Sequence, residues 1–200
     1  MNFTPTSIAA LIVAASFAAG LNVYATVATL GLLARFHWVA LPPGLDAISN
    51  PWIIGSASLL FVVEFFADKI PAFDLLWNAA HTFIRVPVAA LLAYKAASQL
   101  SPELQLLAAA AGAAISALAH TSKTAARVLV TPSPEPLSNV ALSAGEDVAA
   151  VSLTWLATHH PYLGGGIATV AIVVLVFSLR WVLVRLKRLS RRLFHRLHAE

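Results

Sequence analysis

Long runs of apolar residues, separated by short polar or proline-rich stretches, make up most of the chain. A helix that crosses a membrane needs about 20 mostly apolar residues. The pattern predicts long helices at 8–33, 72–98, 103–130 and 163–189, and shorter ones at 52–67 and 144–158. The expected fold class is therefore all-α, a polytopic membrane helix bundle of about six spans.

The two halves of the chain, about 8–98 and 103–189, repeat one order of elements. Each half has a long helix, a proline-rich loop (39–51 and 131–143), a short helix, a proline turn and a long helix. An internal repeat decides the architecture of a chain. Three crossings per half is an odd number, so the pattern predicts a 3+3 inverted repeat of the kind common in secondary transporters. The short second and fifth helices are the candidates for broken or re-entrant segments.

Composition and charge narrow the class of protein. The 200 residues are 59% hydrophobic and only 11% charged, against about 25% charged in soluble domains. Seven basic residues lie between Arg180 and Arg196, so the net positive charge of the chain comes from its C-terminal end. We interpret 1–179 as one transmembrane domain and 180–200 as a basic tail that continues the last helix. Nucleic acid binding is a poor explanation of such a tail, and contact with anionic lipid head groups is a better one.

The placement of lysine and arginine predicts the orientation. The basic tail favours a cytoplasmic C-terminus, and six crossings would put the N-terminus there too. The expected location is the inner (plasma) membrane of the cell, as a multi-pass protein. The chain contains no cysteine, which excludes disulfides, thiolate metal sites and a cysteine nucleophile. No cofactor or metal set is indicated, and no nucleophile–base motif argues for an enzyme.

Two predicted helices each carry a polar stripe with a 4, 3, 4 spacing, which places its members on one helix face. The first stripe is Asp74, Asn78, His81 and Arg85, and the second is Ser116, His120, Lys123 and Arg127. Ionisable side chains inside apolar helices indicate a functional site by default. We therefore predict that His81, Arg85, His120, Lys123 and Arg127 bind substrate. The alternative is that some of these charges sit at the membrane interface, where Lys123 and Arg127 would be ordinary positive-inside residues.

Acidic residues near the first stripe are candidates for charge pairing or proton coupling. Glu64 stands in an aromatic run and must be paired or protonated there, with Lys123 or Arg127 as the expected partner. Asp68, Lys69 and Asp74 flank the turn at Pro71 and have a second explanation as head-group contacts.

Three further polar positions interrupt apolar helices. Asn22 is a candidate substrate-binding residue that could join the polar centre. Glu146 and Asp147 follow Gly145, close to the expected start of the short helix at 144. Acidic residues are favourable at a helix N-terminus, so we interpret these two as capping residues.

These motifs resemble a bacterial membrane family known as domain-of-unknown-function family 4126, over about residues 8–175. The family pattern E-x-x-x-D-K-I-P corresponds to Glu64, Asp68, Lys69 and Pro71, and H-x-x-K-x-x-x-R corresponds to His120, Lys123 and Arg127. The family's D-x-x-W segment with His and Arg-Pro is similar to Asp74, Trp77, His81 and Arg85. One departure is Val86, which separates Arg85 from Pro87. The resemblance implies no established activity.

The leading hypothesis is a small secondary transporter or permease with an intramembrane His/Arg/Lys/Glu/Asp centre. Basic clusters coordinate phosphate and carboxylate, so the expected substrate is a small anion or a phosphate-bearing lipid head group, with histidine titration as a route to proton coupling. The alternative is a non-transporting scaffold or lipid-binding protein whose charges form a structural salt-bridge network. Lipid chemistry with His81 or His120 as base is a third hypothesis, and assembly into a homo-oligomer stays open.

Overall fold

The computed structural model describes residues 3–67, 71–130 and 136–197, and the regular structure in these ranges is entirely helical. This confirms the all-α bundle. The elements are α1 (Pro5–Leu21), α2 (Val23–Arg35), η1 (Pro43–Ser49), α3 (Pro51–Ala67), α4 (Pro71–Ala96), α5 (Pro102–Val130), α6 (Pro136–His159) and α7 (Pro161–Leu197).

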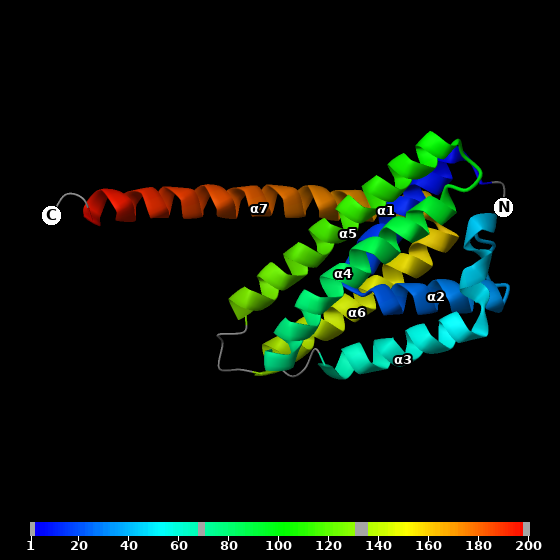
Figure 1. Cartoon of the computed structure of the whole chain (residues 1–200), viewed down its shortest axis with the longest axis horizontal. Coiled ribbons are helices and arrows are strands. Elements are labelled where there is room, and N and C mark those ends of the chain that lie inside the picture. The colour runs from blue at the N-terminus through cyan, green and yellow to red at the C-terminus, as the bar shows by residue number, and fades with distance from the viewer. Residues whose placement is uncertain (1–2, 68–70, 131–135, 198–200) are drawn as a thin grey trace.

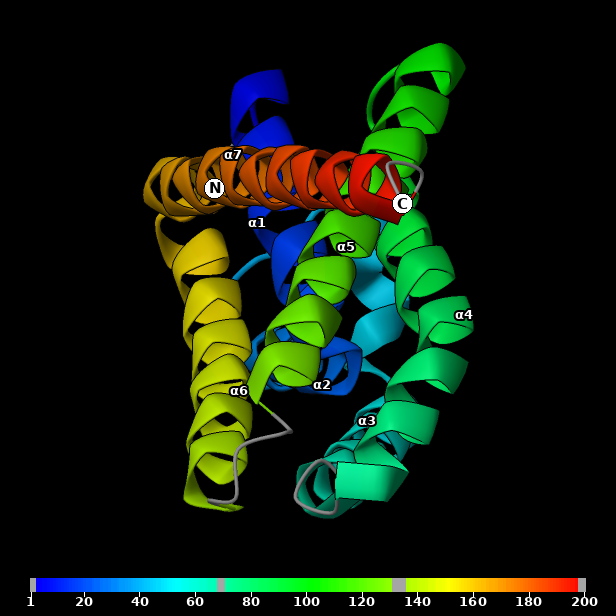
Figure 2. The same ribbon diagram turned by 90° about the vertical axis from the view of Figure 1, so that its left-hand side faces the viewer.

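Helix α1 is the centre of the bundle. It packs against α4, α5, α6 and α7, and α4 packs extensively along α5 (Figure 1). Helix α3 lies on the outside, held mainly by α2, with few contacts to α4 and α6. The far part of α7 extends well beyond the other helices (Figure 1), and Figure 2 shows α7 crossing in front of them. The bundle therefore has a tightly packed centre, with α3 and the far part of α7 at its periphery.

The apolar run 8–33 is two helices, so the prediction of one long helix is wrong. The break is at Asn22, whose backbone is extended (φ −148°, ψ 104°). The Asn22 side chain accepts a hydrogen bond from the Ala25 amide at 2.9 Å, and asparagine is among the best helix N-caps. Helix α2 then turns back toward the side of the molecule where the chain begins (Figure 1).

This break changes the number of crossing helices. Within the described ranges, three helices are long and apolar enough to cross a membrane, at Pro102–Ala126, Val140–His159 and Pro161–Trp181. The pair η1 and α3, bent by 67°, raises the number to four if it counts as one span. The sequence predicts about six because it treats 8–33 as one span and the polar-striped α4 as another.

Helix α6 begins eight residues earlier than predicted. The stretch 131–143 contains three prolines and reads as a loop, but the described part of it, from Pro136 onward, is already helical. Proline is favoured in the first turn of a helix because it has no amide donor to leave unpaired. The predicted short fifth helix is therefore a regular helix of 24 residues.

Gly20 allows α1 and α5 to approach closely, and its replacement gives a testable prediction. A Cβ at Gly20 would lie 2.6 Å from the Ser116 carbonyl oxygen and 2.7 Å from the Ala119 Cβ. We expect Gly20→Ala to lower the free energy of unfolding by about 1–3 kcal/mol, because backbone must move to admit the methyl group.

Gly55 on α3 is the matched control, since a Cβ there meets nothing within 4 Å. Gly55→Ala should be neutral or stabilising by up to about 1 kcal/mol, because glycine is a poor helix former. Unfolding of both variants in mixed micelles measures the difference, and equal stabilities would contradict the packing argument.

Candidate functional site

A buried ion pair joins the peripheral helix α3 to α4. Glu64 on α3 and Arg85 on α4 are fully buried, and the Arg85 guanidinium donates to the Glu64 carboxylate through Nη2. A charge in such a place is costly unless it is paired and hydrogen-bonded. Arg85 is thus the nearer partner of Glu64, and Lys123, one of the two partners that the sequence predicts, lies 3.8 Å from Glu64 Oε1.

His120 on α5 extends the pair into the second half of the chain. Arg85 Nη1 lies 2.8 Å from His120 Nδ1, and the Thr82 hydroxyl lies 2.7 Å from His120 Nε2. Arginine can only donate, so Nδ1 accepts and Nε2 carries the proton that is donated to Thr82. This geometry holds His120 in the neutral form. The two polar stripes predicted from the sequence therefore meet face to face.

Lys123, one turn further along α5, contacts three helices. Its ammonium lies 3.2 Å from Glu146 Oε2 on α6, 3.8 Å from Glu64 Oε1 on α3, and donates to the Leu21 carbonyl at 3.1 Å. Leu21 is the last residue of α1, immediately before the break. We call Glu64, Arg85, His120, Lys123 and Glu146 the ion network. With His120 neutral, the two acidic and two basic residues of the ion network have a net charge of zero.

Asn22 ties the break itself to this region. Its side-chain amide donates to Asp147 Oδ1 at 2.8 Å, while its Oδ1 caps α2. Asn22 is fully buried, and Asp147 and Glu146 are buried on α6. The prediction that Glu146 and Asp147 cap a helix is wrong, because both lie in the middle of α6 and face the ion network and Asn22.

His81 connects α4 to α2. Its Nδ1 lies 2.7 Å from the Trp77 carbonyl, and its Nε2 lies 2.8 Å from the Tyr24 hydroxyl. A carbonyl can only accept, so Nδ1 carries a proton and donates to it. The imidazole stacks on the Trp77 ring at 4.3 Å between centroids. Both ring nitrogens of each histidine in the stripes thus have a hydrogen-bond partner.

The structure joins four of the residues that the sequence selects, namely Glu64, Arg85, His120 and Lys123, and it places Asn22 against Asp147 and His81 against Tyr24. Asp74 lies in α4 and Arg127 in α5, in parts of these helices whose side chains are not described. Asp68 and Lys69 lie outside the described residues. Their assignment to substrate binding or charge pairing stays a prediction.

Sequence reasoning missed Glu146 and Asp147 as members of this region. A signal for them exists: two adjacent acids stand inside an otherwise apolar stretch, and such residues usually mark function. The proline-rich stretch before them suggested a helix start nearby, which made the capping interpretation attractive. Thr82 was missed because a threonine in an apolar helix has no distinctive pattern.

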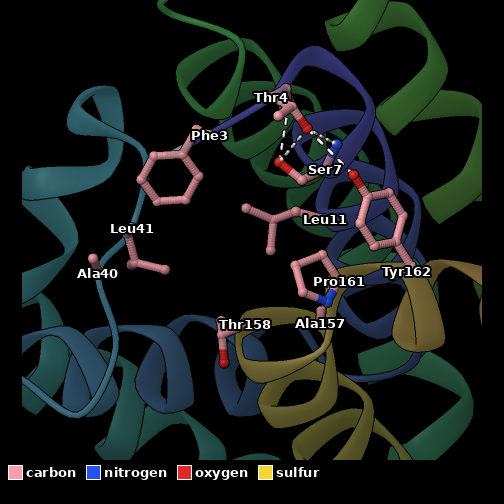
Figure 3. Close-up of a pocket in the computed structure, with 10 residues that line it drawn as sticks. All are labelled: Phe3, Thr4, Ser7, Leu11, Ala40, Leu41, Ala157, Thr158, Pro161 and Tyr162. Atoms are coloured by element: carbon pink, nitrogen blue, oxygen red, sulfur yellow. Dashed lines mark hydrogen bonds between the residues drawn. The ribbon is translucent and has the colours of Figure 1, made fainter. Parts of the chain in front are cut away.

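A separate pocket of about 240 Å³ lies at the opposite end of α1 (Figure 3). It is formed by the start of α1, Ala40 and Leu41, and the turn from α6 to α7. The Thr4 hydroxyl lies 3.3 Å from the Tyr162 hydroxyl and donates to Ser7, and these groups converge at one side of the pocket in Figure 3. None of the predicted site residues lines it, so the ion network is the candidate site.

Comparison with protein families gives a match over most of the chain. The family described as "Domain of unknown function (DUF4126)" matches residues 9–181. The chain belongs to this family. No curated protein and no solved structure matches it.

The region shared with the DUF4126 family contains the whole ion network, the break at Asn22 and the Tyr24–His81 contact. It ends at Trp181, so most of the basic end of α7 lies beyond the match. The apolar helices of this DUF4126 protein indicate a membrane protein. Its function must be argued from the geometry of the network.

Proposed function

We propose that this protein is a small secondary transporter in which a substrate anion and a proton together displace an internal ion pair. The observation that carries the proposal is the ion network at the α1–α2 break. It joins Glu64 and Arg85 of the first half to His120, Lys123 and Glu146 of the second. A buried network between two halves is where carriers of this architecture place their substrate and coupling ion.

The electrostatics suggest how an anion would bind. Arg85 and Lys123 both contact Glu64 Oε1 in the observed arrangement. Protonation of Glu64 would remove one of the two negative charges that neutralise Arg85 and Lys123. An anion that takes the place of the carboxylate would restore neutrality, and Arg85 and Lys123 suit phosphate or carboxylate groups. Proton and anion would then move together, with a small anion or a phosphate-bearing head group as the substrate class.

The break at Asn22 supports a carrier over an inert bundle. Discontinuous helices near the membrane midplane provide helix ends that contact charged groups. Here the C-terminal end of α1 receives the Lys123 ammonium, and the N-terminal end of α2 is capped by Asn22. The inverted repeat belongs to this proposal, with α2 to α4 corresponding to α5 to α7.

Helix α3 is the element that would open. It carries Glu64, it packs mainly on α2, and it is bent by 67° from η1. Because Glu64 is its buried charged contact to α4 and α5, loss of that contact on protonation would free α3 to move. The observed state, with Glu64 and Arg85 fully buried, would be the occluded one.

Flux into liposomes tests the proposal. Purified protein should take up radiolabelled inorganic phosphate faster when the outside is acidic. Glu64→Gln, which resembles the protonated carboxyl, should lose this pH dependence, and Arg85→Lys should reduce uptake at least tenfold by removing the contact with His120. Lys95→Met, at an exposed position of α4, is the control and should behave as wild type.

The scaffold alternative gives the opposite pattern in the same assay. It is favoured by one observation, that Arg85 and Lys123 already have carboxylate partners inside the protein. If phosphate, sulfate and small carboxylates all show no protein-dependent uptake, while Glu64→Gln only lowers thermal stability, the network is structural.

Orientation is part of the proposal and has its own test. The basic end of α7 would face the cytoplasm and anionic lipid head groups, with Arg185 over the Trp181 ring at 5.0 Å. Because α2 turns back at Asn22, we now propose that the N-terminus lies on the opposite face of the membrane from the C-terminus.

Cysteine labelling tests this orientation. The chain has no cysteine, so a single introduced cysteine is the one reactive thiol. Ser190→Cys should react with an impermeant maleimide only from the cytoplasmic face, and Thr6→Cys only from the other. Labelling of both from one face would contradict the revision.

A further inference from the structure

The described contacts of the buried Lys123 ammonium are all made to oxygen atoms. Its ammonium is surrounded by the Leu21 carbonyl oxygen at 3.1 Å, Glu146 Oε2 at 3.2 Å and Glu64 Oε1 at 3.8 Å. These oxygens come from three different helices, and Lys123 itself is buried. All-oxygen surroundings of carbonyls and carboxylates are those that hard cations prefer.

The position of this group in the fold has a chemical meaning. The end of a broken helix leaves carbonyl oxygens without their helical partners. In carriers with discontinuous helices, such carbonyls coordinate a coupling cation such as Na⁺. In this chain the C-terminal end of α1 is such a place, and the Lys123 side chain reaches it from α5.

We propose that Lys123 is a built-in cation that occupies an alkali-metal site at the α1–α2 break, which makes this protein independent of Na⁺ and K⁺. This inference rests on the proposed transport function and adds that the transport cycle needs no alkali-metal ion. A tethered ammonium neutralises Glu64 and Glu146 permanently, so no free metal ion has to bind before the halves close around the substrate.

Charge balance predicts what happens when the ammonium is removed. The network is neutral with Lys123 present and carries one net negative charge without it. Lys123→Ala would also leave space beside two carboxylates and a carbonyl. An alkali-metal ion fits both the charge and the space. Lys123→Met removes the charge but fills the space, so it gives a matched control without a site.

The experiment is a thermal-unfolding titration in detergent at pH 8, with NaCl or KCl replacing N-methyl-D-glucamine chloride at constant ionic strength. We expect Lys123→Ala to be less stable than wild type in N-methyl-D-glucamine and to gain several degrees in Tm as Na⁺ or K⁺ rises, with saturation. A ligand that binds only the folded state stabilises it in this concentration-dependent way. Wild type, Lys123→Met and Lys95→Ala should show no such gain.

Two further variants make the result decisive. Lys123→Ser keeps a small side chain with an oxygen and should behave as Lys123→Ala, so it serves if the alanine variant does not fold. The double variant Lys123→Ala with Glu146→Gln restores neutrality and should lose the cation effect. The proposal is overturned if neither Lys123→Ala nor Lys123→Ser is stabilised by alkali-metal ions more than wild type is. It is also overturned if wild type itself is stabilised by them in a saturating way.

The outcome is separable from that of the transport proposal. Phosphate uptake by wild type should be equal in Na⁺ and N-methyl-D-glucamine, and uptake that requires Na⁺ would overturn the built-in cation. If no uptake is found in either salt, the transport proposal fails. The Tm titration would then still decide whether Lys123 occupies a cation site.

Discussion

Arg85→Met is expected to destabilise the protein by about 3–5 kcal/mol, the largest effect of any single substitution in the network. The reason is that the change leaves the Glu64 carboxylate buried without its main partner, and an uncompensated buried charge is expensive. Arg85 also donates to His120 Nδ1 and accepts from Ser116 Oγ at 3.4 Å through its carbonyl. The side chain is fully buried, so water cannot replace these contacts.

A second substitution separates charge from packing. Adding Glu64→Gln to Arg85→Met removes the stranded carboxylate and leaves Lys123 paired with Glu146. Replacing both partners of a buried pair is often nearly neutral, so the double variant should recover most of the lost stability. Lys95→Met on the same helix is exposed and should change stability by less than about 0.5 kcal/mol. Chemical unfolding in mixed micelles measures all three, and a double variant as unstable as Arg85→Met would show that packing dominates.

Asn22→Ala is expected to cost about 2–4 kcal/mol, the second largest effect. The variant loses the cap of α2, worth about 1 kcal/mol. It also loses the hydrogen bond to Asp147, and hydrogen bonds to charged groups contribute about 1.5–3 kcal/mol. Both losses occur at a fully buried position.

Asn50 provides the matched control for Asn22. Its Oδ1 accepts from the Trp52 amide at the start of α3, in an exposed position and with no carboxylate involved. Asn50→Ala should cost only about 1 kcal/mol. If the two alanine variants lose the same stability, the contact between Asn22 and Asp147 contributes nothing beyond an ordinary helix cap.

The sequence predicts the composition of the network better than its connections. A 4, 3, 4 spacing defines one helix face whatever the tertiary structure, so Arg85, His120 and Lys123 could be found from spacing alone. Which acid meets which base depends on how helices cross. Glu64 pairs with Arg85 because α3 and α4, consecutive helices in the chain, bring these two side chains together, and the spacing within either stripe does not predict this contact.

The break at Asn22 shows why the fold could be predicted only in part. Hydropathy is continuous across 8–33, and one asparagine in an apolar run fits within an unbroken helix. The helix breaks because Asn22 caps α2 and finds Asp147 on α6, 125 positions away in the chain. A contact that distant cannot be read from local pattern. The late start predicted for α6 has a local cause instead, since proline begins helices as readily as it ends them.

Proton uptake on anion binding tests the central claim most directly. Protein in weakly buffered detergent at pH 7 would be titrated with formate, a monoanion that does not itself titrate at this pH, while a pH indicator follows the solution. The exchange of the Glu64 carboxylate for a monoanion predicts close to one proton taken up per formate bound by wild type and none by Glu64→Gln. Formate bound by wild type with no proton uptake would contradict the exchange.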